Sequence, residues 1–427
     1  MEEQYYDKFE EILLEDLQQA LGCTEPIAIA LCAAKAKSIL NKVPTKVILH
    51  CSKNIIKNAK SVTVPNSNGL KGIEVAAALG IVGGNSDKNL KVLEDITESN
   101  IEEAKKLIAS KIFTIEIADV PNLLYIRTEL IFENDVVSVE IKDRHSNISK
   151  ITKNKEVIYS SEDDSSGDNQ ECDKSLLNIH SIIEFADSVD LSKRKELTNR
   201  LDLQIECNTN ISKEGLSGKY GAGIGHIISE TSFETDIKSE VKACTTAASD
   251  ARMGGCGLPV VINSGSGNQG ITTSLPVITY AKSINASKDK LYRALIVANL
   301  TTIHQKQFIG KLSAFCGVVS AGAAAGCGIG YLMGLNEEQI EKVLVNTLAT
   351  SGGIVCDGAK PSCALKIAVA LENAFLAIDM AKRDIVFDSG DGIVGENVEK
   401  TIENIGRMAS VGMKNTDDEI LNIMIGK

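Results

Sequence analysis

The feature that most constrains how this chain can fold is a run without any charged side chain, residues 312–336. The run is long enough to cross a lipid bilayer as a helix. It consists largely of glycine, alanine and serine, however, whereas a membrane span relies on larger apolar residues. Gly322, Gly326, Gly330 and Gly334 recur at every fourth position, so another backbone could approach this helix face closely. We therefore predict a helix buried on all sides inside a soluble helical domain.

Cysteines stand on either side of this helix. Cys316 precedes it and Cys356 follows the next predicted helix, and both lie near glycines, as expected at helix ends and turns. Cys23 occupies a similar place before a third helix, for which Thr24 is the expected N-cap and Pro26 lies in the first turn. The dipole of that helix would favour a thiolate at Cys23. The alternative is that Cys23 is simply a small buried residue.

The overall charge argues against several classes of partner. The chain has 427 residues and a net charge of −12, and it shows no basic patch with interleaved aromatic residues. Nucleic acid and anionic membrane surfaces are therefore not expected partners. The first 17 residues are acidic and amphipathic, unlike a signal or transit peptide, so we expect a cytoplasmic protein.

The eleven cysteines are not expected to form disulfides in the cytoplasm. No C-x-x-C occurs, and none of the five histidines is spaced as in a zinc site, so an iron–sulfur centre with distant ligands is favoured over zinc. Three cysteines would leave one iron open as a Lewis acid, whereas four would close the cluster for electron transfer. The cysteines whose local sequence suits ligation are Cys23, Cys256, Cys316, Cys356 and Cys363.

The predicted fold class is α+β, with two domains. Residues 1–174 are expected to combine N-terminal helices with a β-meander, with strands at 45–64 and 112–160. Residues 175–427 are expected to form a helical domain that binds the cluster and the substrate. The acidic stretch 160–173 is interpreted as an exposed loop or linker. For Cys23, which precedes the β region, and Cys316, which follows it, to share one centre, the N-terminal helices must pack against the helical domain.

A loop rich in glycine, serine and asparagine, residues 263–270, contains the pattern G-x-G-x-x-G. A dinucleotide site is one interpretation, but Pro276 falls where the following helix should run and a βαβ pattern is absent. We favour a loop whose amide groups bind a small carboxylate. The turn at 65–69 is either a second anion cradle or an ordinary turn. Lys360, close to Cys356, is a candidate general base or one half of a solvated pair with Asp357.

Several long segments together resemble the L-cysteine desulfidase family, whose members are similar to the serine dehydratase alpha chain. The segments are LGCTEPIAIA (21–30), KNAKSVTVPNSNGLKGIEVAAALG (57–80), SDARMGG (249–255), NSGSGNQGI (263–271), IGKLSAFCG (309–317) and GGIVCDGAKPSCALK (352–366). The resemblance implies a lyase that works without pyridoxal phosphate and carries a [4Fe–4S] cluster on Cys23, Cys316 and Cys356. Cys363 is kept as an alternate thiol for the cluster, and Cys256 is not counted among the cluster ligands.

The resemblance also implies the reaction, in which L-cysteine is degraded to pyruvate, ammonia and sulfide by β-elimination. The alternatives are an iron–sulfur L-serine dehydratase, a non-catalytic cluster-binding redox or sensor protein, and a dinucleotide-binding oxidoreductase. The partner is a small amino-acid substrate, and a homodimer is left open. Expected catalytic residues are Glu25, Lys360 and Lys366. Expected substrate-binding residues are Ser264, Gly265, Ser266, Gly267, Asn268, Gln269, Asn66, Ser67 and Asn68.

Overall fold

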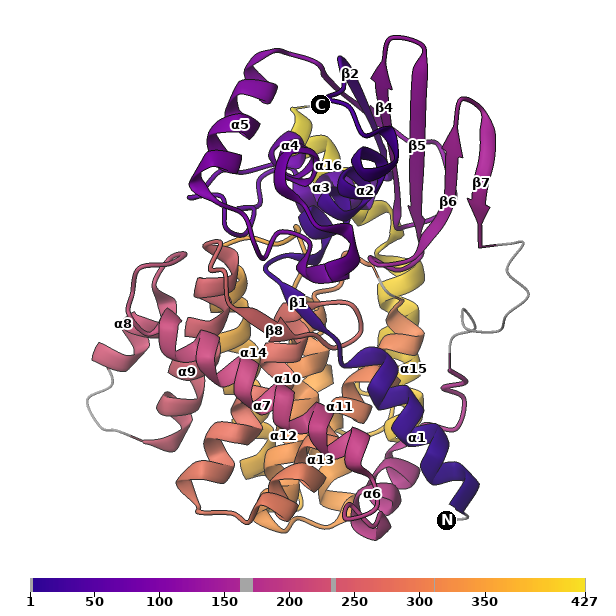
Figure 1. Ribbon diagram of the computed structural model, residues 1–427. Coiled ribbons are helices and arrows are strands. Elements are labelled where there is room, and N and C mark those ends of the chain that lie inside the picture. Colours follow the sequence, from indigo (N-terminus) through magenta and orange to yellow (C-terminus); the bar gives the residue numbers. More distant parts are fainter. Residues whose placement is uncertain (1–2, 162–171, 232–235, 311, 427) are drawn as a thin grey trace.

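The computed structural model describes residues 3–161, 172–231, 236–310 and 312–426. A twisted sheet with several short helices forms one end of the molecule, and a bundle of longer helices forms the other end (Figure 1). The fold is a mixture of helices and one principal sheet, which is antiparallel except for one parallel pair, and it agrees with the α+β prediction. The strands are β1 (Gln19–Leu21), β2 (Lys46–Cys51), β3 (Phe113–Ile117), β4 (Tyr125–Phe132), β5 (Asp135–Lys142), β6 (Ile148–Lys153), β7 (Glu156–Ser160) and β8 (Pro259–Val261).

The helices of the first half of the chain are α1 (Glu3–Asp16), α2 (Thr24–Leu40), α3 (Lys53–Ala59), α4 (Ile73–Gly83), the 3-10 helix η1 (Ser86–Lys91), α5 (Glu98–Ala109), α6 (Ile179–Ser188) and α7 (Lys195–Gly215). The helices of the second half are α8 (Ile224–Thr231), α9 (Ile237–Met253), α10 (Gly267–Ser283), α11 (Lys288–Ile309), α12 (Gly317–Met333), α13 (Glu337–Ser351), α14 (Cys363–Ala381), α15 (Val398–Arg407), the π-helical turn η2 (Met408–Gly412) and α16 (Lys414–Ile425).

The principal sheet has the strand order β3-β2-β4-β5-β6-β7. The meander prediction is confirmed for β4 to β7, which pair as antiparallel neighbours. It is wrong for β3, which lies parallel to β2 at the edge after a crossover through helices. It is also wrong for much of residues 45–64, where α3 follows β2 directly because Ile55, Ile56 and Ala59 are buried at helical spacing. Helix α2 packs against β4 and β5.

The glycine-rich run forms α12, at the centre of the helical bundle, where it contacts α10, α11, α13 and α14. Its side chains are buried almost without interruption from Val318 to Leu332, so the predicted buried helix is confirmed. A Cβ atom on Gly322 would lie 2.9 Å from the Cβ of Ala370, and one on Gly326 would lie 3.1 Å from Val343 Cγ1. Gly334 instead ends the helix in a left-handed conformation. None of the described helices has both the length and the apolar composition needed to cross a membrane.

We expect Gly322→Leu to lower the free energy of unfolding by about 1–3 kcal/mol or more, because there is no room for a side chain between α12 and α14. Gly353→Leu is the matched control, since Gly353 is exposed and has open space around its Cα. Chemical unfolding followed by circular dichroism measures both variants. Equal loss of stability in the two would show that close approach at Gly322 is unimportant.

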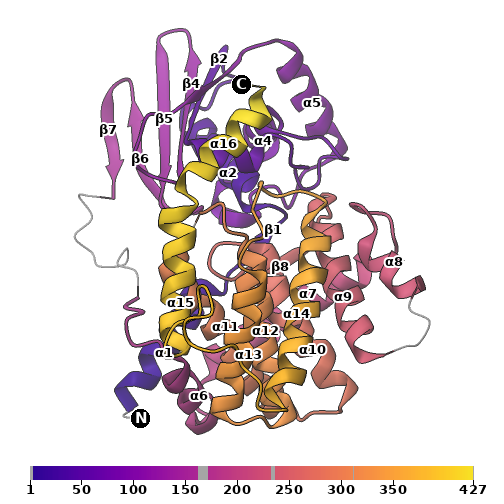
Figure 2. The same ribbon diagram turned by 180° about the vertical axis from the view of Figure 1, so that it is seen from behind.

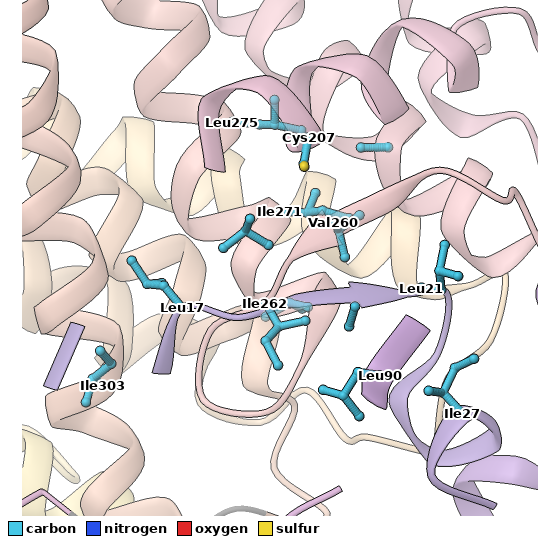
Figure 3. Packing of buried hydrophobic residues seen from close by; sticks show 14 of the residues in the cluster. Leu17, Leu21, Ile27, Leu90, Cys207, Val260, Ile262, Ile271, Leu275 and Ile303 are labelled. Carbon is cyan, nitrogen blue, oxygen red and sulfur yellow. The ribbon is translucent and has the colours of Figure 1, made fainter. Parts of the chain in front are cut away.

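Strand β1 connects the two ends of the molecule by pairing with β8, with Gln19 opposite Val261 and Leu21 opposite Pro259. Apolar side chains surround this two-stranded ribbon (Figure 3). Leu21 and Ile27 come from the N-terminal segment, whereas Ile271 and Leu275 belong to α10, and all four are buried. The ribbon therefore fixes the start of α2, and with it Cys23, against the helical bundle.

The last two helices run along one side of the molecule from the bundle to the sheet (Figure 2). In the bundle, Glu399 of α15 accepts hydrogen bonds from His304 Nε2 at 2.6 Å and from the backbone N–H of Ile179 at 2.8 Å. Burial alone would raise the pKa of Glu399, but His304 and this N–H outweigh burial and hold the pKa below its usual value of 4.5. The carboxylate of Glu399 therefore binds a proton less readily in the folded state than in the unfolded state.

Glu399→Gln should consequently lower the free energy of unfolding at pH 7 by about 1 kcal/mol, since the Glu399 side chain is about one-third exposed and screened by water. The advantage of the native carboxylate is present above pH 4.5 and is lost as the pH falls through the lowered folded pKa. Urea unfolding of both proteins between pH 7 and pH 3 measures the difference. A difference in the free energy of unfolding that stays constant from pH 7 to pH 3 would contradict the lowered pKa of Glu399.

Other differences from the predicted elements have local causes. Helix α10 runs straight through Pro276, which is buried in its interior. Cys23, not Thr24, is the N-cap residue of α2, and its side chain makes no capping hydrogen bond. The final helix α16 is not anticipated by the sequence patterns. Most of the acidic stretch 160–173 lies outside the described residues.

Candidate functional site

A cavity of about 100 Å³ lies where the start of α2 meets the helical bundle, and four cysteines line it. We call it the cysteine cavity. Cys23 and Cys316 are the N-cap residues of α2 and α12, and Cys363 is the first residue of α14. A fourth helix, α10, also begins at the cavity with its N-cap Ser266. Four helix N-termini thus direct the positive ends of their dipoles to one place, which favours negative charge there.

The backbone places Cys316 beside Cys356. The N–H of Cys316 donates to the carbonyl of Ile354 at 3.0 Å, and the N–H of Cys356 donates to the carbonyl of Ala314 at 2.6 Å. These two hydrogen bonds flank an isolated antiparallel bridge between Phe315 and Val355. The prediction of a helix end or turn is confirmed for Cys316, whereas Cys356 lies in an irregular segment directly after the bridge residue Val355. The bridge explains how residues forty positions apart come together.

Lys57 of α3 fixes the Cys356 segment from the other side. Its side chain is 2% exposed, its Nζ donates to the carbonyl of Cys356 at 3.4 Å, and it forms an ion pair with Asp417 of α16. Lys60 Nζ donates to the carbonyl of Met424 in the same helix. The C-terminal helix therefore supports the cysteine-bearing loop through Lys57.

Glu25 lies directly behind Cys23 and is buried. Its carboxylate accepts hydrogen bonds from Cys23 Sγ at 2.9 Å, from Thr24 Oγ1 at 3.2 Å and from Asn58 Nδ2 at 2.9 Å. His145 Nε2 lies 3.8 Å from Glu25 Oε1, which is too long for a hydrogen bond but close enough for electrostatic attraction. Burial raises the pKa of Glu25, yet His145 and the hydrogen-bond donors outweigh it and lower the pKa, so this carboxyl is ionised.

The expectation that the helix dipole makes Cys23 a thiolate is wrong for the thiol in this environment. Burial, and then the charge of Glu25, raise the pKa of Cys23 well above its usual value. Burial and the nearby thiols of Cys356 and Cys363 likewise raise the pKa of Cys316, and burial raises that of Cys363. Two or more thiolates would therefore coexist here only with a compensating positive charge.

Three buried cations supply positive charge close to these thiols. Arg252, at the end of α9, is 3% exposed, and its Nε has no hydrogen-bond partner among the described residues. Lys306 of α11 is 9% exposed, and burial lowers its pKa to about 8 although the charges of Cys356 and Cys316 act the other way. Lys360 Nζ is also buried without a described partner, and burial lowers its pKa. An anion in this cavity would meet uncompensated cations.

The glycine–serine loop forms one wall of the cavity. Ser264 and Gly265 have positive φ angles, and the carbonyl of Gly265 accepts a hydrogen bond from Thr24 Oγ1 at 3.1 Å. The side chain of Gln269 lies against Gly317, and its buried Oε1 has no hydrogen-bond partner among the residues that the structure describes. Because β8 is a short strand paired antiparallel to β1, the loop does not belong to a parallel βαβ unit. The geometry argues against the dinucleotide interpretation.

The structure brings most of the predicted site residues together, but not all of them. The predicted residues that line the cysteine cavity are Cys23, Glu25, Ser264, Gly265, Ser266, Asn268, Gln269, Cys316, Cys356 and Cys363. Gly267 lies just behind this wall, in contact with Arg252. Lys360 is adjacent, since its N–H donates to Cys363 Sγ at 3.4 Å.

The turn at 65–69 lies elsewhere and uses its side chains to hold itself in place. Asn66 Nδ2 donates to the carbonyl of Leu93, Ser67 Oγ donates to that of Val64, and Asn68 Nδ2 contacts the carboxylate of Glu98. None of these three side chains is among the residues that line the cysteine cavity. The side chains of this turn therefore have a structural role, and Pro65 packs against Gly22.

Lys366 is engaged in an ion pair. Its Nζ lies 2.5 Å from Asp357 Oδ1 and 3.0 Å from the carbonyl of Val355. Burial lowers the pKa of Lys366, but the contact with Asp357 outweighs it and raises the pKa. A lysine held in this way has no lone pair for accepting a proton, so the geometry favours Lys360 over Lys366 as a base.

The donor set fits an iron–sulfur cluster. Four thiols from three parts of the chain share one cavity, and thiolates are the usual ligands of such clusters. Across the described ranges, no three His, Cys, Asp or Glu side chains lie close enough to bind one metal ion together.

Sequence reasoning missed four residues of this site: Asn58, His145, Arg252 and Lys306. Arg252 stands inside the SDARMGG segment, so a signal existed, but nothing in the pattern shows that its side chain is buried beside thiols. His145 comes from the turn between β5 and β6, and Lys306 comes from the last turn of α11. Only the tertiary fold brings these isolated residues to the cavity.

A buried cavity with thiols, uncompensated cations and an ionised carboxylate defines an enzyme-like site for an anionic or zwitterionic molecule. Comparison with known proteins agrees with this class. A family model described as the serine dehydratase alpha chain matches residues 87–422. The chain belongs to the serine dehydratase alpha chain family, and it is a serine-dehydratase-like enzyme of the lyase class.

Similar proteins occur in several bacteria. The UPF0597 protein of Desulfitobacterium hafniense is 48% identical over 426 residues, which covers 100% of this chain and 98% of that protein. UPF0597 proteins of Lachnoclostridium phytofermentans and Finegoldia magna are each 46% identical, and each alignment covers 98% of this chain and 99–100% of the relative. These names do not state a substrate.

Proposed function

We propose that this protein is an L-cysteine desulfidase, a lyase that degrades L-cysteine to pyruvate, ammonia and sulfide with a [4Fe–4S] cluster in the cysteine cavity. The observation that carries the proposal is the meeting of four thiols, three buried and that of Cys356 half-buried, with the cations Arg252, Lys306 and Lys360, none of which forms an ion pair with a residue that the structure describes. Cys23, Cys316 and Cys356 would hold the cluster, and Cys363 would be an alternate thiol. When bound, such a cluster supplies a Lewis-acidic iron that makes sulfide a better leaving group.

The residues of the chain perform the remaining tasks. Donor groups of the loop 264–269 would bind the α-carboxylate, and Glu25, which is ionised and buried, would attract the substrate ammonium. Lys360, whose pKa burial lowers, is our candidate for accepting the Cα proton. Loss of this proton and breakage of the Cβ–S bond release sulfide and leave aminoacrylate, which hydrolyses to pyruvate and ammonia.

The alternative substrate is L-serine, with hydroxide in place of sulfide as the leaving group, and the family model supports this chemistry directly. Anaerobically purified and reconstituted protein should be assayed with both amino acids under identical conditions. We expect a higher kcat/KM for L-cysteine. A higher kcat/KM for L-serine would make the protein an L-serine dehydratase, and turnover of neither would favour a non-catalytic cluster-binding protein.

A further inference from the structure

A second and larger cavity, of about 340 Å³, adjoins the cysteine cavity. We call it the outer chamber. The two cavities share the lining residues His145, Ser264, Gly265, Lys306 and Leu312. These residues therefore form a common wall between the outer chamber and the thiols. The outer chamber therefore adjoins the site where the reaction is proposed to occur.

Most charges of the outer chamber are already compensated. Glu15 forms an ion pair with Arg144, and Asp16 lies 2.6 Å from Lys174. Asp143 accepts a hydrogen bond from Asn122 at 2.9 Å. The exception is a cation in the common wall, since the side-chain ammonium of Lys306 forms no hydrogen bond or ion pair with the residues that the structure describes.

Lys306 is 9% exposed, and burying an ammonium group without an anion is costly. Its position in the wall makes it accessible from both cavities. A small anion that passes from the outer chamber towards the thiols would therefore contact Lys306. Ser264 and Gly265 lie in the same wall, so loop donors are available for the same anion.

We propose that the outer chamber admits the amino-acid substrate and that Lys306 binds its α-carboxylate at the common wall. The inference rests on the proposed function in that the ligand is an α-amino acid. The amino group would then face Glu25, which lies on the far side of the same wall beside His145. Lys306 is thus assigned a role in substrate affinity and specificity, separate from the cysteines.

The test uses L-alanine, which has the carboxylate and ammonium of the substrate but no β-leaving group. Isothermal titration calorimetry should compare the native protein with Lys306→Met, Lys306→Arg and Lys290→Met. Lys290 lies on the same helix α11 and is exposed, so it is the matched control. We expect Lys306→Met to weaken L-alanine binding at least about 10-fold, because a charge-assisted hydrogen bond is lost. Lys306→Arg should recover part of the affinity, and Lys290→Met should bind normally.

Two further measurements separate this role from others. Ethylamine lacks the carboxylate, so any binding of ethylamine should be the same in the native protein and Lys306→Met. In turnover, KM for L-cysteine should rise more than kcat falls. Unchanged L-alanine affinity in Lys306→Met would overturn the inference, and so would a loss of bound iron in that variant without a change in affinity. If Lys306→Met does not fold, the affinities for L-alanine and for ethylamine are compared between the native protein and Lys306→Arg instead. A lower affinity of Lys306→Arg for L-alanine alone would support the inference, and unchanged affinity for L-alanine would overturn it.

The outcome is distinguishable from failure of the proposed function. A native protein that turns over neither amino acid but binds L-alanine through Lys306 would sustain the inference and refute the desulfidase. A native protein that releases sulfide normally, together with a Lys306→Met variant that keeps full affinity and an unchanged KM, would support the desulfidase and refute the role of Lys306.

Discussion

Cys316→Ala is expected to abolish both iron binding and lyase activity, with a loss of activity of more than about 100-fold, because even residues that only support metal ligands cost 10- to 100-fold when replaced. Cys316 is buried at the N-terminus of α12, and its backbone is held beside Cys356 by two hydrogen bonds. Cys23→Ala and Cys356→Ala should behave in the same way. Iron and sulfide analysis together with the visible absorption spectrum of anaerobically reconstituted protein measure the effect.

Two other cysteines serve as comparisons for this experiment. Cys244→Ala should keep full iron content and activity, because Cys244 lies on α9 and does not line the cysteine cavity. Cys363→Ala should keep the cluster if three cysteines hold it. Loss of the cluster in Cys363→Ala as well would indicate four protein ligands and an electron-transfer or sensor role. Full iron content in any of the three expected ligand variants would show that the ligand set is wrong.

Gly267→Ala should reduce kcat/KM by about 100-fold while leaving the fold intact, because a small misplacement of an active-site group has effects of this size. An added Cβ would lie 2.2 Å from Nε of Arg252, so the guanidinium must move out of its place beside the cysteine cavity. The end of a flexible side chain can move at little cost in stability. Steady-state kinetics with L-cysteine and the thermal unfolding midpoint measure the two effects separately.

Gly270→Ala is the matched control, one turn along the same helix. Its Cβ would lie 2.1 Å from the carbonyl oxygen of Val261, which belongs to β8 and cannot move freely. We expect a loss of about 1–3 kcal/mol or more in the free energy of unfolding. Arg252→Met, with Gly267 unchanged, should reproduce the kinetic defect of Gly267→Ala. Near-native kinetics in both Gly267→Ala and Arg252→Met would show that Arg252 does not contribute to the activity.

Much of the fold follows from patterns that are local in the sequence. The glycine repeat predicts the buried helix α12, and alternating residues predict the β4–β7 meander, because both depend on neighbours a few positions away. The parallel pairing of β3 with β2 was not predicted, since it depends on a crossover of some sixty residues. Pro276 misled the interpretation of α10, because tertiary packing maintains a helix that local propensity would interrupt.

The site divides in the same way. Cys23, Cys316 and Cys356 could be named from the sequence because they stand in distinctive segments near helix ends. Lys306 could not be named, since a lysine on a helix is ordinarily exposed and only its burial marks it out. The ionisation of Cys23 was wrongly predicted from the helix dipole alone, because burial and the charge of Glu25 have the larger effect on its pKa.

The central claim is that this chain eliminates sulfide from an amino acid by means of an iron–sulfur site formed by its own cysteines. The most direct measurement is product analysis after adding L-cysteine to anaerobically reconstituted protein, with pyridoxal phosphate omitted and with Cys316→Ala treated in parallel. Our account predicts equal amounts of sulfide, pyruvate and ammonia from the native protein and none of them above background from the variant. A fully iron-loaded native protein that releases no sulfide, or a variant that releases as much as the native protein, would contradict it.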